Sequence, residues 1–385
     1  MRTPFTGLVP FTLYNVVVAL MVLVVSASAQ PLPEQYREPF AQSFPIRQEQ
    51  HLQIKAYAER LPPKAAPAAA IPPLAPDFSS VDAYKASLAP AREQLRTFFG
   101  VPPGAMEEGR ITKFEQVGED RHCVVHRVWI EVIPGVEAYG LYLVPKQRVG
   151  KAPLLIAQHG GGGNPEAICD LDTRDNYRGF GPEAVKRGYI VWAPALAMRS
   201  TFSGDPDIPG ANREQLDQRL QRGGTSIIGL ELHKIIVSTR ALMKTRPEID
   251  VERVGMTGLS WGGFYTMYVT ALSPFIKAAA PSAFFKDYDD IVARAKEGKA
   301  RSPDRDVVGG LGHAQAIALI CPRPCFVQMG EDDSVVPIAG GRKESEQAVV
   351  YYRNLGLTDR YEFQVHEGGH VYDTPAILNF FDRTL

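Results

Sequence analysis

The sequence is poor in features that mark several classes of protein. Its 385 residues include only four cysteines, and no two Cys-x-x-Cys motifs occur together, which argues against a structural zinc site. The formal net charge is −1, so no excess of either sign indicates nucleic acid or an anionic membrane surface. No internal repeat is visible. We expect buried free thiols at Cys123, Cys169, Cys321 and Cys325, although a disulfide stays possible in an exported protein.

The N-terminus also lacks a long apolar run. Val16 to Val25 is uninterrupted, but it is far shorter than the roughly 20 residues that a transmembrane helix needs. Arg2 precedes the run and Ala27-Ser28-Ala29 follows it, in the pattern that signal peptidase recognises. We therefore predict that residues 1–29 are an export signal cleaved near Ala29. The mature protein would be periplasmic or extracellular without a stable membrane span; an uncleaved anchor is the alternative.

Residues 30–110 differ in composition and pattern from the rest of the chain. Residues 65–76 are rich in alanine and proline, which does not suit a long helix. Val81 to Phe99 reads as one helix, with Asp77, Ser79 or Ser80 as its cap and Gly100 at its end. We expect a packed N-terminal extension over 30–110 and a catalytic domain over 111–385.

From Ile111 onward the pattern is that of an α/β protein. His126 to Val144 predicts antiparallel strands around Pro134-Gly135. Short apolar strands then alternate with helices, which predicts a mostly parallel sheet with helices on both faces. The predicted strands are 154–157, 189–194, 251–257, 276–280, 325–329 and 361–365, and the predicted helices are 227–243, 263–272 and 377–385.

A candidate nucleophile lies between the third of these strands and its helix. Gly258-Leu259-Ser260-Trp261-Gly262 has the Gly-x-Ser-x-Gly spacing of a nucleophile elbow, and the strand–turn–helix context is the one that the elbow requires. Glycine on both sides of the serine removes Cβ clashes in a strained turn. An ordinary glycine turn is the alternative interpretation.

A second glycine run, His159 to Gly163, ends an earlier predicted strand. Acyl transfer places negative charge on the former carbonyl oxygen, which preorganised backbone N–H groups stabilise. We expect one such donor from Trp261 and the other from Gly161 or Gly162. A phosphate-binding loop is disfavoured because no Lys-Ser/Thr follows. We expect His159 itself to be structural.

We expect the other two members of a catalytic triad, a histidine and an acid, late in the chain. His370 lies on a loop beyond the last strand, at the edge of the sheet where catalytic groups gather, and His366 is its rival. The acid that orients the histidine is expected within Glu331-Asp332-Asp333, which also follows a strand. Residue chemistry alone does not choose among the three.

Several of these segments resemble the dienelactone-hydrolase and acetyl-xylan-esterase-like branch of the α/β-hydrolase superfamily, over about residues 125–385. The similar segments are 245–250 before 254–260, and 318–324 leading into 330–337. The resemblance implies that Asp333 is the acid, from the pattern Gly-x-x-Asp-x-x-Val-Pro, and that His370 is the base, from Gly-Gly-His.

The chain also departs from that family. Its nucleophile is serine, whereas dienelactone hydrolases proper use cysteine, and Trp192 to Leu196 lacks the Asp-x-Arg-Gly of many relatives. Residues 199–226 are polar and glycine-rich, and we expect them to cover the site as a lid-like loop.

Together these features predict an exported serine carboxylesterase that acts through an acyl-enzyme with Ser260, Asp333 and His370, and needs no metal or organic cofactor. The expected partner is a small-molecule or carbohydrate ester, such as acetyl groups on xylan by analogy. The alternatives are a serine peptidase of the prolyl-oligopeptidase type and a non-catalytic hydrolase-fold binding protein.

Overall fold

The computed structural model describes residues 31–64, 70–172, 176–197 and 213–385, and Pro33 to Leu385 form one compact unit. The predicted export signal, part of the Ala/Pro-rich stretch and the first half of the predicted lid-like loop lie outside the described residues. Within them, no helix is long and apolar enough to cross a membrane.

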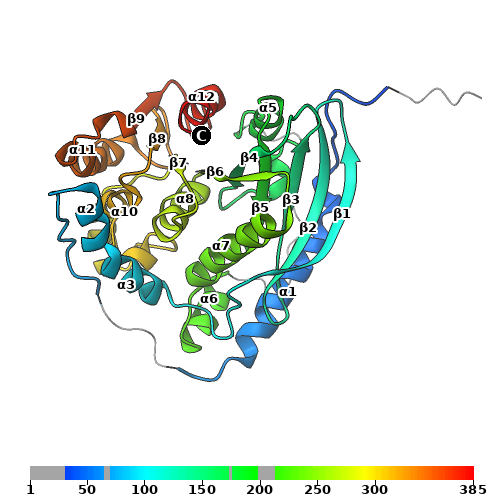
Figure 1. Cartoon of the computed structure of the whole chain (residues 1–385). Coiled ribbons are helices and arrows are strands. Elements are labelled where there is room, and N and C mark those ends of the chain that lie inside the picture. Colours follow the sequence, from blue (N-terminus) through cyan, green and yellow to red (C-terminus); the bar gives the residue numbers. More distant parts are fainter. Residues whose placement is uncertain (1–30, 65–69, 173–175, 198–212) are drawn as a thin grey trace, which may run out of the picture. The chain divides into compact units, whose positions relative to one another are not determined.

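Helices and strands alternate along most of the unit (Figure 1). The helices are α1 (Phe44–Arg60), α2 (Val81–Ser87), α3 (Ala89–Phe99), α4 (Pro165–Ile168), α5 (Phe180–Lys186), α6 (Arg213–Arg222), α7 (Ile227–Thr245), α8 (Trp261–Leu272), α9 (Tyr288–Lys296), α10 (His313–Ile320), α11 (Ile338–Asn354) and α12 (Thr374–Thr384). The strands are β1 (Arg110–Glu119), β2 (Cys123–Ile133), β3 (Val136–Pro145), β4 (Ala152–Gln158), β5 (Ile190–Pro194), β6 (Ile249–Leu259), β7 (Ala278–Ser282), β8 (Cys325–Gly330) and β9 (Tyr361–His366).

The strands form one nine-stranded sheet in the order β1-β2-β3-β5-β4-β6-β7-β8-β9. The pairs β1–β2, β2–β3 and β3–β5 are antiparallel, and every later pair from β5 to β9 is parallel. The carboxyl ends of β4, β6, β7, β8 and β9 therefore lie along one edge of the sheet. The glycine run, Ser260, the acidic run and His370 each follow one of these strands.

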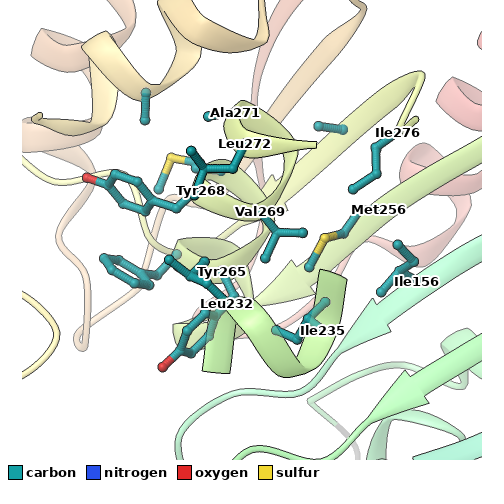
Figure 2. Packing of buried hydrophobic residues seen from close by; sticks show 14 of the residues in the cluster. Ile156, Leu232, Ile235, Met256, Tyr265, Tyr268, Val269, Ala271, Leu272 and Ile276 are labelled. Carbon is teal, nitrogen blue, oxygen red and sulfur yellow. The ribbon is translucent and has the colours of Figure 1, made fainter. Parts of the chain in front are cut away.

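Alternate side chains of the parallel strands face two separate apolar cores. On β4, Leu154 and Ile156 belong to a core with α7 and α8, whereas Leu155 and Ala157 belong to one with α5 and α12. Figure 2 shows the first core, where Ile156 and Met256 of the sheet lie near helix side chains such as Val269. Helices thus cover both faces, and the predicted architecture is confirmed.

The N-terminal helices differ from the sequence prediction in two ways. The segment 81–99 is not one helix: α2 ends at Ser87, and α3 starts at Ala89 with Pro90 in its first turn, where a proline without an N–H is tolerated. Helix α1 was not predicted, because much of its buried face is polar and shows no apolar period. Arg47, Gln50 and His51 are all buried there.

Those polar residues attach α1 to the sheet. The Arg47 guanidinium pairs with Glu166 at 3.1 Å with both side chains almost fully buried, and the Tyr139 hydroxyl donates to the same carboxylate at 2.7 Å. The Gln50 amide donates to the Glu137 carbonyl at 3.0 Å. Helix α1 is therefore packed against the catalytic part of the chain.

Replacing Arg47 with Met should leave the Glu166 charge buried without its cation, which costs about 3 kcal/mol of stability. Urea unfolding should show this loss as a lower midpoint with an unchanged m-value. The matched control is Lys244→Met, because the Lys244–Glu108 pair is largely exposed and such pairs add little. Equal midpoints for the two variants would contradict a role for the Arg47 pair in holding α1.

Two further expectations concern the loops and the cysteines. The described part of the predicted lid-like loop is not all loop: residues 213–222 form α6, whose buried side chains Leu216 and Leu220 supply the apolar contacts. All four cysteines are free and buried, in agreement with the thiols expected from the sequence.

Candidate active site

Ser260 lies in a sharp turn between β6 and α8. Its φ is +60° and its ψ −123°, a conformation that L-residues rarely adopt and that stores strain. The Ser260 N–H donates to the carbonyl of Ser282, at the end of the neighbouring β7, at 2.9 Å. A Cβ on Gly258 would lie 2.2 Å from the Gly262 carbonyl oxygen, and one on Gly262 would lie 2.0 Å from that of Gln158. Both glycines are needed for this turn.

The structure distinguishes the three adjacent acids after β8. Glu331 and Asp332 are exposed, whereas the Asp333 side chain is completely buried. One Asp333 carboxylate oxygen, Oδ1, accepts from the N–H groups of Val335 at 2.8 Å and Val336 at 2.9 Å. The other, Oδ2, lies 2.7 Å from Nδ1 of His370.

The charge of Asp333 follows from these contacts. Burial acts to raise its pKa, but the hydrogen bond from His370 and those from the two amides together hold the pKa below its usual value. The group is therefore a carboxylate at neutral pH. A carboxylate acceptor fixes the proton of His370 on Nδ1 and leaves Nε2 as the basic nitrogen of the neutral ring.

His370 reaches Asp333 through a turn beyond β9. Gly368 has a φ of +135°, and a Cβ on Gly330 would lie 2.2 Å from the Gly369 carbonyl oxygen. The loop after β9 thus packs directly on the end of β8. His366, the rival histidine, ends β9 and is buried, and its Nδ1 contacts the Glu367 carbonyl at 3.3 Å. Of the two histidines, His370 is the one hydrogen-bonded to Asp333.

The glycine run after β4 lies against the serine turn. A Cβ on Gly160 would lie 3.2 Å from the Cβ of Ser260, and one on Gly161 would lie 2.6 Å from the Trp261 ring. The Gly160 N–H donates to the hydroxyl of Tyr177 at 2.9 Å. The segments that carry the predicted oxyanion donors Trp261, Gly161 and Gly162 are therefore in contact.

His159 is buried beside this loop and keeps its backbone in place. Its Nδ1 donates to the Gly160 carbonyl at 2.8 Å, and its Nε2 accepts from the Leu196 N–H at 3.0 Å. Burial lowers its pKa to about 3. Both ring nitrogens are already used, so the geometry fits the structural role expected for His159.

The neutral state of His159 makes stability depend on pH. Its pKa falls from 6.5 to about 3 on folding, so the unfolded chain takes up the proton first as pH decreases. The stability that the neutral His159 contributes is therefore present above pH 6.5 and is lost progressively below it. Between pH 7.5 and 5 the loss should be about 2 kcal/mol.

Urea unfolding at both pH values measures the total loss, to which the buried His313 also contributes. The comparison with His159→Gln, whose amide can still donate and accept, gives the part due to His159. We expect a smaller decrease in the variant than in the wild type. An equal decrease would show that His159 is not the buried neutral group responsible.

A cavity of about 410 Å³ lies beside the acid turn. Its lining includes Lys286, Asp290, Arg294 and Asp304 from the segment after β7, and Val335 and Pro337 from the turn after Asp333. Its walls thus belong to the same sheet edge as Ser260 and His370. In the part of the chain that the structure describes, no group of three or more His, Cys, Asp or Glu side chains could hold a metal ion.

Sequence reasoning missed the residues that support the site from other elements. Tyr177 holds the glycine run, and the Arg213 guanidinium lies 4.9 Å from the centre of the Trp261 ring. Neither belongs to a local motif or follows a strand, so only the folded arrangement identifies them.

Comparison with known proteins supplies the family. The model of the dienelactone hydrolase family matches residues 166–366, just over half of the chain, and this span includes Ser260 and Asp333. A Bacillus subtilis (strain 168) protein named as a hydrolase, YtaP, is 22% identical over 274 residues, which cover 68% of this chain and 87% of that protein.

Two solved structures with the same architecture are esterases by name. One described as an acetyl xylan esterase, from Bacteroides fragilis NCTC 9343, is 17% identical with a TM-score of 0.60 and covers 81% of each chain. A glucuronoyl esterase from Solibacter usitatus is 14% identical with a TM-score of 0.57, over 85% of this chain and 99% of its own. At these identities the likeness establishes the α/β-hydrolase fold. With the family match, it shows that this chain belongs to the dienelactone hydrolase family of α/β-hydrolases.

Proposed function

We propose that the protein is an exported serine carboxylesterase whose catalytic residues are Ser260, Asp333 and His370. The observation that carries the proposal is the 2.7 Å hydrogen bond between Asp333 and His370, at the same edge of the sheet as the strained Ser260. Strained backbone at an elbow, a buried carboxylate and an oriented imidazole are the parts that acyl transfer requires.

In the proposed reaction, the Ser260 hydroxyl oxygen attacks the ester carbonyl carbon while Nε2 of His370 takes its proton. The N–H of Trp261 and that of Gly161 or Gly162 stabilise the oxyanion. The intermediate then expels the alcohol, which receives the proton from His370, and the acyl group remains on Ser260. Water activated by His370 releases the acid and restores the serine.

The proposed substrates are carboxylic esters, including acyl groups on carbohydrate. The names of the structural relatives support an ester with a carbohydrate part, which is the alcohol in acetyl xylan and the acyl group in a glucuronoyl ester.

A hydrolysis screen over acyl length and alcohol type tests this assignment. It should include p-nitrophenyl acetate, acetylated xylo-oligosaccharides and a peptide substrate. We expect hydrolysis of acetyl esters and labelling of Ser260 by a fluorophosphonate probe. Cleavage of the peptide instead would favour a serine peptidase of the prolyl-oligopeptidase type, and a chain with neither activity nor labelling would be a non-catalytic binding protein.

Export is proposed from residues 1–29 alone. The supporting features are the short apolar run and Ala27-Ser28-Ala29. Mass spectrometry of the protein from a bacterial periplasm or medium should show a chain that begins near Gln30. A full-length chain in the membrane fraction would show instead that the segment is an anchor.

A further inference from the structure

The indole of Trp261, the residue directly after Ser260, contacts the glycine run. A Cβ built on Gly161 lies 2.6 Å from Cδ2 of the ring and 2.9 Å from both Cε2 and Cε3. Since Cδ2 is bonded to both of the other atoms, these nearly equal distances place Gly161 over the face of the ring. The face of the indole therefore packs against the backbone of Gly161.

The same ring contacts a buried cation. The Arg213 guanidinium lies over it, 4.9 Å from the ring centre, and only 7% of the Arg213 side chain is exposed. A desolvated guanidinium over an aromatic face is an attractive contact. Arg213 is the first residue of α6, so this contact links α6 to the first residue of α8.

Arg213 is held in place by three further partners. Its Nη2 donates to the Tyr265 hydroxyl at 3.0 Å, and its Nη1 donates to the Ala197 carbonyl at 3.2 Å. Nη1 also lies 3.9 Å from the Glu231 carboxylate. Tyr265 is one turn after Trp261 on α8, so the guanidinium lies along the first turn of that helix. Glu231 is shared with Lys234, which lies 3.3 Å from the same carboxylate. Since the contact of Arg213 with Trp261 is with the ring, its effect on Trp261 is expected to be one of position.

We propose that Arg213 is a positioning residue for the oxyanion hole and acts through the indole of Trp261. The inference rests on the proposed function. The ring fixes the distance between two backbone segments, Gly161 and Trp261, whose N–H groups are the proposed donors. Arg213 holds the ring, so the donors stay at the separation that the oxyanion requires.

A double-mutant cycle tests this proposal, with Arg213→Met, Trp261→Phe and the double variant. The readouts are kcat and KM for p-nitrophenyl acetate, and the affinity for phenylboronic acid, whose serine adduct carries the tetrahedral anion. Arg213→Met should lower kcat about 10- to 100-fold, because small displacements of catalytic groups have effects of that size. KM should change by less than about twofold, since the effect is confined to the transition state. Boronate affinity should decrease by the same factor as kcat.

The coupling between the Arg213 and Trp261 substitutions shows whether Arg213 acts through the Trp261 ring or independently of it. If Arg213 acts through Trp261, the double variant should be no slower than the slower single variant, because contacting residues are not additive. Additive losses, or a change in KM alone, would overturn the proposal. If Arg213→Met does not fold, Tyr265→Phe takes its place in the cycle. It removes one hydrogen-bond acceptor of Arg213 and should give a smaller loss of kcat with the same coupling.

Arg127→Met is the matched control for stability. Arg127 is also buried, donates to a tyrosine hydroxyl, that of Tyr139, at 3.2 Å, and pairs with a glutamate, Glu38, but it lies on β2. It should lose stability and keep kcat within about twofold. Equal losses of kcat in the two arginine variants would overturn the proposal.

The outcome for the wild type separates this inference from the proposed function. If the wild type is not labelled at Ser260 and hydrolyses no ester, the proposed function fails and this inference fails with it. If the wild type is labelled and active but Arg213→Met keeps its kcat, only the role of Arg213 is rejected.

Discussion

Replacing Ser260 with alanine should lower kcat for acetyl ester hydrolysis by about 10⁶-fold, the loss found when a triad serine is removed and the oxyanion hole remains. The change deletes one oxygen atom. Alanine and serine meet the same backbone restriction at φ +60°, so the fold should be retained. The measurement is the initial rate with p-nitrophenyl acetate, together with urea unfolding of the same preparation.

Ser273→Ala is the matched control for this prediction. Ser273 follows the other end of α8, and its buried hydroxyl has no hydrogen-bond partner among the described residues, so its removal should leave the rate unchanged. Fluorophosphonate should label the control and not Ser260→Ala. Full activity of Ser260→Ala would refute the assignment of the nucleophile, whatever the rest of the site does.

Replacing Asp333 with asparagine should lower kcat by about 10⁴-fold. The amide keeps an oxygen for the Val335 and Val336 N–H groups, so the turn can persist. Its NH₂ group, however, can donate to Nδ1 of His370, where the carboxylate accepts at 2.7 Å. The proton of the neutral ring would then lie on Nε2, which could no longer take the proton of Ser260.

Asp332→Asn provides the comparison, because the side chain of Asp332 is exposed and lies one residue away. Its kcat should remain within about twofold of the wild type, as for other surface substitutions. A large loss in Asp332→Asn together with little loss in Asp333→Asn would assign the acid to Asp332 and contradict the role given to the buried carboxylate.

Local patterns predicted the elements of the sheet edge well. The strand before Ser260, the glycines around it and the helix after it all depend on neighbouring residues, whose sterics and apolar period are visible in the sequence. An element that depends on distant contacts was not predicted. In helix α1, Arg47 is buried because it pairs with Glu166, which is more than a hundred residues away in the chain. A pattern of apolar residues cannot reveal such a helix.

The residues of the candidate site can also be separated into those that the sequence indicated and those that the structure explains. Order along the chain and the nearby glycines were enough to propose Ser260 and His370, since a tight turn after a buried strand leaves few alternatives. The choice among Glu331, Asp332 and Asp333 came from resemblance, and the structure supplies its physical basis. One of three adjacent carboxylates is buried and receives N–H groups, while the other two face solvent.

What the sequence determined by itself was the class of fold and the positions where chemistry could occur, because both follow from short-range sterics and the periodicity of apolar residues. The tertiary structure alone decided which groups meet. The contacts of Asp333 with His370, of Gly161 with Trp261 and of Arg213 with that ring join segments that are distant in the chain. Their geometry depends on the packing of the whole sheet and its helices, which no local stretch of sequence encodes.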